Sequence, residues 1–154
     1  NPLSWYLNDN RNVAAKLAKE GDDWLQRGDY KHAAKKYQDS LFLNDKSGQV
    51  HYNLATASLQ IGAEEEYARA IFHFNRAIEL AGADAPKLYA LGLAYFKVGQ
   101  KETARQVWSD ALKFDPNNTG AKNGLAVLDK PQGSAAGPTG FTVRRVAQKT
   151  FNIP

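Results

Sequence analysis

The sequence predicts an all-α protein made of paired antiparallel helices. Three observations predict this fold class: apolar and small residues recur at helical spacing, glycine-containing turns interrupt them at regular intervals, and one residue pattern occurs three times in succession. In the first occurrence of the pattern the apolar and small positions are Val13, Leu17, Trp24, Ala33, Tyr37 and Leu41. The dipeptide Gly28-Asp29 is expected to break the chain between the two helices of this repeat.

The repeated pattern is clearest in residues 85–118. There the series is Leu88-x-x-Leu91-Gly92-x-x-Tyr95, followed by Gly99, Ala104-x-x-x-Trp108, Ala111 and Pro116. Residues 14–47 and 48–84 carry the same series in register, with Ala33-x-x-x-Tyr37 and Ala70-x-x-x-Phe74 in the second half of each unit. The three windows follow one another without a gap, so chance agreement is an unlikely source of the pattern.

This pattern resembles the tetratricopeptide repeat, in which two antiparallel helices carry small residues at their crossing and bulky residues between repeats. The resemblance covers three repeats, 14–47, 48–84 and 85–118, and residues 119–129 are expected to form a capping helix that shields the last apolar face. It implies that residues 14–129 form a right-handed superhelical stack of antiparallel helix pairs, an α-solenoid of tetratricopeptide type. The aromatic residues expected in its core are Trp24, Tyr37, Phe74, Tyr95 and Trp108.

The second repeat is longer than the other two. Its extra residues fall near Ala63 and Glu64-Glu65-Glu66, and the insertion is close to one helical turn of about 3.6 residues. The second helix of this repeat is therefore expected to start one turn early and keep its phase. The glutamates would then lie at the positive end of the helix dipole, where negative charge is favourable.

The segments that flank the repeats differ from them in composition. Residues 1–13 form an N-terminal extension, residues 130–140 read as a flexible linker, and residues 141–154 read as a basic-apolar linear segment. The chain carries a formal net charge of +4, and Lys130, Arg144, Arg145 and Lys149 supply that excess with no acidic residue among them. Because synthesis starts with methionine, a chain that begins at Asn1 is expected to be processed or cut from a longer protein.

Several function classes are disfavoured by residue content. The sequence has no cysteine, which excludes disulfides, thiolate metal sites and cysteine nucleophiles. His32, His51 and His73 are scattered at spacings that predict no metal site, and no serine has a recognisable base, so we expect no cofactor and no enzymatic activity. The body is electrically balanced and has no long apolar run, so we expect neither nucleic-acid binding nor direct membrane insertion.

The resemblance implies that the first helix of each repeat lines a concave groove. The side chains expected to reach this peptide-binding groove are Asp22, Leu25, Gln26, Tyr52, Thr56, Leu59, Gln60, Tyr89, Leu93, Phe96 and Lys97. Its middle would be apolar and aromatic, as a hydrophobic peptide or an amphipathic helix requires. The alternative is that Tyr52 and Tyr89 pack against neighbouring repeats and that Leu25 packs against the N-terminal segment.

One subclass of the family grips the C-terminal carboxylate of chaperone tails with two lysines, two asparagines and an arginine. The resemblance places Ala18, Asp22, Asn53, Pro86 and Ala90 at the corresponding positions. Such a clamp needs several cationic donors around one carboxylate, and of these residues Asn53 alone matches. We therefore expect this groove not to bind chaperone tails.

The C-terminal segment itself is a candidate ligand of the groove. Its apolar anchors are Phe141, Val143, Val146, Phe151 and Ile153. A ten-residue linker spans roughly 17 Å root-mean-square, which allows binding in cis or to a second copy of the chain. The segment could instead be disordered, begin a further domain, or be a partner peptide joined through the linker.

Taken together, the residues favour a protein–protein interaction adaptor whose partner is a protein or peptide. The alternative is a scaffold that self-assembles into a homo-oligomer through the repeat surfaces, the C-terminal segment or the N-terminal Trp5-Tyr6-Leu7.

Overall fold

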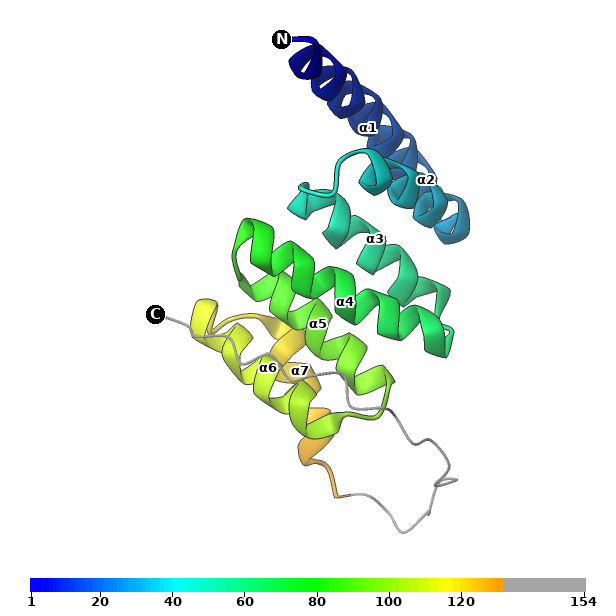
Figure 1. The fold of residues 1–154 in the computed structure, drawn as a ribbon. Helices are drawn as coiled ribbons and strands as arrows, with labels where there is room; N and C mark the ends of the chain where they lie inside the picture. Colours follow the sequence, from blue (N-terminus) through cyan, green and yellow to red (C-terminus); the bar gives the residue numbers. More distant parts are fainter. Residues whose placement is uncertain (132–154) are drawn as a thin grey trace. The chain divides into compact units, whose positions relative to one another are not determined.

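The computed structural model describes residues 1–131, which form helices and turns without any strand (Figure 1). The helices are α1 (Pro2–Gln26), α2 (Tyr30–Leu43), α3 (Gly48–Ile61), α4 (Glu64–Ala81), α5 (Ala85–Lys97), α6 (Lys101–Phe114) and α7 (Thr119–Asp129). The predicted all-α fold class is confirmed. Within the described residues no helix is both long enough and apolar enough to cross a membrane.

The chain divides into two compact units, each described by itself. The first unit comprises residues 1–83, in which α1 packs on α2, α2 on α3 and α3 on α4, while α1 also touches α3. The described part of the second unit is residues 84–131, in which α6 packs on both α5 and α7, and α5 also touches α7. Within each unit, helices that are consecutive in sequence pack against one another and bury apolar side chains between them.

Polar side chains cap the start of five of the helices. Backbone N–H groups in the first turns of α1, α2, α3, α5 and α7 donate hydrogen bonds to the side chains of Asn1, Asp29, Ser47, Asp84 and Asn118 respectively. These N-caps satisfy donors that have no partner inside a helix. The hairpins are therefore delimited by local chemistry as well as by packing.

Helix α4 begins differently. Its N-terminus at Ala63 has no side-chain cap, but Glu64, Glu65 and Glu66 occupy its first turn, where the helix dipole favours negative charge. The helix has 18 residues, whereas α2 and α6 have 14 each, so the predicted early start is confirmed. It ends at Gly82, whose φ of 86° lies in the left-handed region that glycine adopts without strain.

Glycines allow the paired helices to approach one another closely. A Cβ atom placed on Gly21 would lie 2.6 Å from the Tyr37 ring, so the aromatic side chain of α2 rests directly on the α1 backbone. In the second unit the Trp108 indole rests in the same way on Gly92 of α5, and it also reaches Gly124 of α7. A larger residue at any of these positions would force the helices apart.

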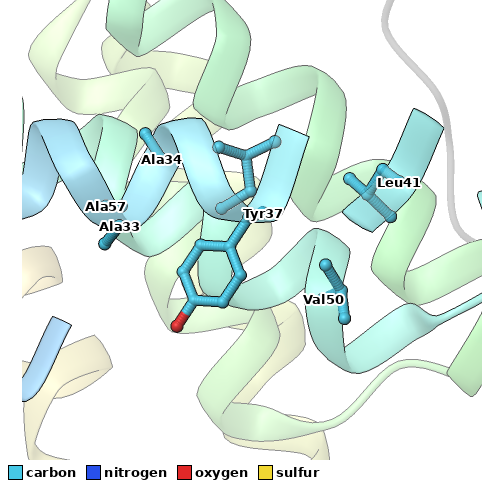
Figure 2. Close-up of a cluster of buried hydrophobic side chains, with 7 residues drawn as sticks. Ala33, Ala34, Tyr37, Leu41, Val50 and Ala57 are labelled. Carbon is cyan, nitrogen blue, oxygen red and sulfur yellow. The ribbon is translucent and has the colours of Figure 1, made fainter. Parts of the chain in front are cut away.

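One core cluster of the first unit, between α2 and α3, is built largely from small residues around the Tyr37 ring. Figure 2 shows Tyr37 with Ala33, Ala34, Leu41 and Val50, all of them buried. Leu54 and Ala57 of α3 complete this cluster. The alanines let α2 and α3 approach closely enough for the larger side chains to interlock.

Four of the five predicted core aromatics are buried as expected, namely Tyr37, Phe74, Tyr95 and Trp108. Trp24 packs against the core cluster around Tyr37 but is only half-buried, so the prediction is confirmed for it only in part. This residue lies near the end of α1, where its ring stacks on His32 at a centroid distance of 4.7 Å and the Arg27 guanidinium lies 5.1 Å from the ring centroid. Polar neighbours at the turn, and not a second apolar layer, cover its outer side.

The N-terminal extension is continuous with the first helix. Helix α1 begins at Pro2 and runs to Gln26, so residues 1–13 bring no separate element, and α1 extends well past the end of α2 (Figure 1). Its projecting part leaves Leu3, Trp5, Tyr6 and Leu7 exposed. Most of the predicted linker and all of the predicted linear segment at 141–154 lie outside the described residues.

Two buried serines give opposite predictions for stability. The Ser40 hydroxyl donates a 2.7 Å hydrogen bond to the Ala14 carbonyl, whereas the Ser58 hydroxyl has no hydrogen-bond partner among residues 1–131. Ser40→Ala should lower the free energy of unfolding by about 1 kcal/mol, because it removes a buried hydrogen bond. Ser58→Ala should raise it by about 1 kcal/mol, because it removes an unsatisfied polar group. Urea denaturation of the two variants measures both changes, and equal signs would contradict this assignment.

Candidate functional site

The eleven predicted groove residues all lie on the first helices of the hairpins. Helix α1 carries Asp22, Leu25 and Gln26, helix α3 carries Tyr52, Thr56, Leu59 and Gln60, and helix α5 carries Tyr89, Leu93, Phe96 and Lys97. Gln26, Gln60 and Lys97 are exposed and the other eight are half-buried. Each side chain thus has surface that a ligand could contact. We refer to the first two groups together as the α1–α3 face.

On the α1–α3 face, the apolar candidate residues pack against buried side chains of the core. The Tyr52 ring meets the buried Phe74 ring edge-on at a centroid distance of 5.6 Å, and Leu25 packs against the core cluster around Tyr37. Thr56 donates a 2.9 Å hydrogen bond to the Tyr52 carbonyl, which satisfies its hydroxyl within the helix. These residues therefore contribute to the core and also present a fixed, partly apolar surface.

Asp22 lies at the centre of a hydrogen-bond network on this face. The Tyr37 hydroxyl donates to Asp22 Oδ1 at 2.6 Å, and Asn53 Nδ2 donates to the same oxygen at 3.0 Å. Gln49 Nε2 in turn donates to Asn53 Oδ1 at 2.9 Å. Burial, reinforced by the hydrogen bond to Asp22, raises the pKa of Tyr37 above its ordinary value, so the hydroxyl remains a donor at neutral pH.

This network bears on the clamp positions. Asn53, the one residue that matches the chaperone-tail clamp, uses its amide N–H to hold the Asp22 carboxylate. The first unit therefore presents a negative charge at a position where the clamp would need a donor, and a peptide carboxylate would meet like charge there. The geometry is consistent with the expectation that chaperone tails are not ligands.

In the second unit, the aromatic candidates are shared between α5 and its neighbours. A Cβ atom on Gly120 of α7 would lie 2.6 Å from the Tyr89 ring, so this ring is seated against α7. The Trp108 Nε1–H donates to the Tyr89 carbonyl at 3.0 Å, and the Phe96 ring lies 5.9 Å from the Trp108 ring. Tyr89 thus packs against the predicted capping helix, as the alternative held, while Leu93 and Phe96 keep part of their surface open.

A hollow of about 450 Å³ opens at the end of the first hairpin. It is lined by residues 27–31, Gln60 and Ile61. Gln60 therefore connects the α1–α3 face to a recess whose walls include the charged residues Arg27, Asp29 and Lys31.

Sequence reasoning missed a histidine pair between α3 and α4. His51 Nδ1 and His73 Nδ1 are 2.8 Å apart, and His51 Nε2 lies 2.9 Å from the Asp45 carbonyl, to which it donates. Neutral His51 must then accept from His73 through Nδ1. Burial lowers the pKa of both histidines, and neighbouring His51, Arg69 and Arg76 help to bring that of His73 to about 4.

Within the described residues the histidine pair has no third metal ligand. Among residues 1–131 no group of three or more histidine, aspartate or glutamate side chains could hold a metal ion. His32 pairs with an acid instead, since its Nδ1 lies 2.7 Å from Asp29 Oδ2 at the exposed start of α2. The 22 residues between His51 and His73 explain why spacing alone did not reveal their contact. The candidate tail ligand, Phe141, Val143, Val146, Phe151 and Ile153, lies outside the described residues.

Comparison with known proteins gives consistent results at three levels. A family model described as the tetratricopeptide repeat matches residues 85–118. Human peptidyl-prolyl cis-trans isomerase FKBP4 is 30% identical, over 82% of this chain and 31% of its own length. The heat shock protein sti1 homolog of Schizosaccharomyces pombe is 27% identical, over 83% of this chain and 21% of its own length. The chain thus spans less than a third of either relative.

Solved structures agree on the fold. The second tetratricopeptide domain of human RPAP3, in complex with the HSP70 peptide SGPTIEEVD, has a TM-score of 0.70 at 22% identity, covering 81% of this chain and 99% of that one. The crystal structure of MamA has a TM-score of 0.71 at 24% identity, covering 81% of this chain and 71% of that one. The predicted tetratricopeptide-like α-solenoid is confirmed.

The histidine pair predicts a pH-dependent stability. Between the ordinary histidine pKa near 6.5 and the value of about 4 for folded His73, the unfolded chain binds more protons than the folded one. Stability is therefore complete above pH 6.5 and decreases as the pH falls towards 4, by about 1–3 kcal/mol from this pair. Urea denaturation at several pH values should show that the double variant His51→Gln, His73→Gln loses this part of the decrease. The exposed His32→Gln variant should retain it, and an unchanged profile in the double variant would refute the assignment.

Proposed function

Because this chain belongs to the tetratricopeptide-repeat family, we propose that it is a protein–protein interaction adaptor whose first helices bind a hydrophobic peptide or an amphipathic helix. The observation that carries the proposal is the solvent accessibility of the predicted groove residues and their support by buried side chains. All eleven retain accessible surface, and the apolar ones are held in place by buried partners such as Phe74 and Trp108. A preorganised surface lowers the entropy cost of binding to that of the ligand alone.

The relatives support a binding role and no catalytic one. The RPAP3 domain is described in complex with an HSP70 peptide, and a second structure, the first tetratricopeptide domain of Spaghetti, is described as bound to the HSP90 peptide SRMEEVD. FKBP4 is an isomerase, but this chain corresponds to less than a third of it. From these relatives we infer that this chain binds a peptide, without inferring which peptide. The network that commits Asn53 to Asp22 argues against acidic chaperone tails as the ligand here.

The preferred ligand in this proposal is residues 141–154, bound by the same chain or by a second copy. Phe141, Val143, Val146, Phe151 and Ile153 would supply apolar anchors. Tethering through the linker would place them at an effective concentration on the order of millimolar, so weak intrinsic affinity suffices.

Self-assembly is the second candidate function, and a specific surface favours it. Trp5 is 70% exposed and Phe42 is 90% exposed. Leu7 and Phe42 line a hollow of about 390 Å³ between the projecting part of α1 and the end of α2. Large apolar side chains that are exposed next to one another are typical of protein contact surfaces.

Peptide binding can be tested with the full chain and a fluorescent synthetic peptide of residues 141–154. Fluorescence anisotropy should show saturable binding that weakens at least about tenfold when the five apolar anchors are replaced by serine, because each buried anchor contributes about 1.5–3 kcal/mol. Leu59→Ala on the α1–α3 face should weaken binding about threefold or more, since it removes half-buried contact area.

The exposed Phe42→Ala variant is the matched control, because it alters an apolar residue of a second helix. It should leave peptide affinity unchanged. A concentration series by light scattering on the same variant separates the functions, since loss of self-association in Phe42→Ala would favour the scaffold. Absence of peptide binding at millimolar concentration to a full chain whose own five apolar anchors are replaced by serine would refute the adaptor proposal, because that chain cannot fill its own groove.

A further inference from the structure

We propose that Asp22 makes the α1–α3 face selective for basic-apolar peptides by receiving an arginine or lysine side chain, and that its occupant is residues 141–154 of this chain. The inference rests on the proposed function, because it names the chemistry of the ligand at the same surface.

The geometry of Asp22 leaves one oxygen for a ligand. Oδ1 accepts hydrogen bonds from both Tyr37 and Asn53, which fix the orientation of the carboxylate. Oδ2 accepts no hydrogen bond from any residue in 1–131, and Asp22 takes part in no salt bridge there. A half-buried, oriented carboxylate oxygen without a partner is a suitable acceptor for a cationic donor.

Asp22 differs in charge from the other predicted groove residues of the α1–α3 face. The other predicted groove residues of α1 and α3 are uncharged: Leu25, Gln26, Tyr52, Thr56, Leu59 and Gln60. Lys36, on α2 of the same hairpin, is already paired with Glu20 at 2.9 Å. Asp22 is thus the one charged group among the predicted groove residues of α1 and α3. The aliphatic part of an arginine or lysine can lie on Leu25 or Tyr52 while its head reaches Oδ2.

The charge of residues 141–154 is complementary to this surface. The segment carries Arg144, Arg145 and Lys149 and no acidic residue, and apolar anchors stand on both sides of these cations. A ligand that alternates apolar and basic residues matches a face on which one carboxylate lies among apolar and amide side chains. A peptide rich in acidic residues would instead be repelled.

The test compares two labelled peptides on the full chain. One has the sequence of residues 141–154, and the other carries Arg144→Gln, Arg145→Gln and Lys149→Gln. The wild-type chain should bind the basic peptide about tenfold more tightly than the neutral one, as expected for one charge-assisted hydrogen bond. The chain's own C-terminal segment lowers both affinities by the same factor, so their ratio is unaffected.

Protein variants assign the preference to Asp22. Asp22→Asn should make the two peptides bind with equal affinity, because it removes the charge that distinguishes them. Asp23→Asn, which removes the same charge from the exposed neighbouring residue, should preserve the ratio. Tyr37→Phe should also preserve it, because the carboxylate remains.

The outcomes separate this inference from the proposed function. If the wild-type chain binds both peptides with equal affinity, the selectivity is refuted while the adaptor function stands. If neither peptide binds a full chain whose own five apolar anchors are replaced by serine, both are refuted. An Asp23→Asn effect as large as that of Asp22→Asn would reduce the preference to general electrostatic attraction and overturn the role of Asp22. If Asp22→Asn fails to fold, the comparison of the two peptides on the wild-type chain still tests whether the chain prefers the basic one.

Discussion

The seating of one large aromatic side chain on a glycine of the preceding helix is the contact on which the hairpins depend. Tyr37 rests on Gly21 and Trp108 rests on Gly92, with no room for a Cβ atom at either position. This close approach determines which side of each first helix is covered. Asp22 and Leu93, the residues that follow the two glycines, consequently lie half-buried at the edge of the contact.

The same contact links the core to the surface. The Tyr37 ring is fully buried, yet its hydroxyl reaches Asp22 and holds the carboxylate in place. A residue needed for packing thus also orients a residue available for recognition. In the second unit Trp108 has a similar double role, since its ring packs against the Phe96 ring and its Nε1–H donates a hydrogen bond to the Tyr89 carbonyl. Rigid support from the core is what allows the half-buried residues to present a defined surface.

Much of the fold could be predicted because its signals are local. The early start of α4 and the buried Tyr37 and Phe74 all follow from spacing within a single repeat. The contacts that were missed join residues from different helices. Asp22 and Asn53 are 31 residues apart, and their contact depends on how successive hairpins stack. His51 and His73 are 22 residues apart, and their contact depends on how α3 and α4 pack within one hairpin. Trp24 was assigned to the core because its spacing is helical, although polar residues at the turn cover it.

The central claim is that the first helices of the hairpins, and not the second ones, recognise a peptide. Backbone amide chemical shifts of the full chain, recorded by NMR during titration with the peptide of residues 141–154, test this directly. The account predicts that the largest shifts occur in α1, α3 and α5, at residues including Gln26, Thr56 and Leu93. Shifts confined to α2, α4 and α6, or to residues 3–7 at the start of α1, would contradict it.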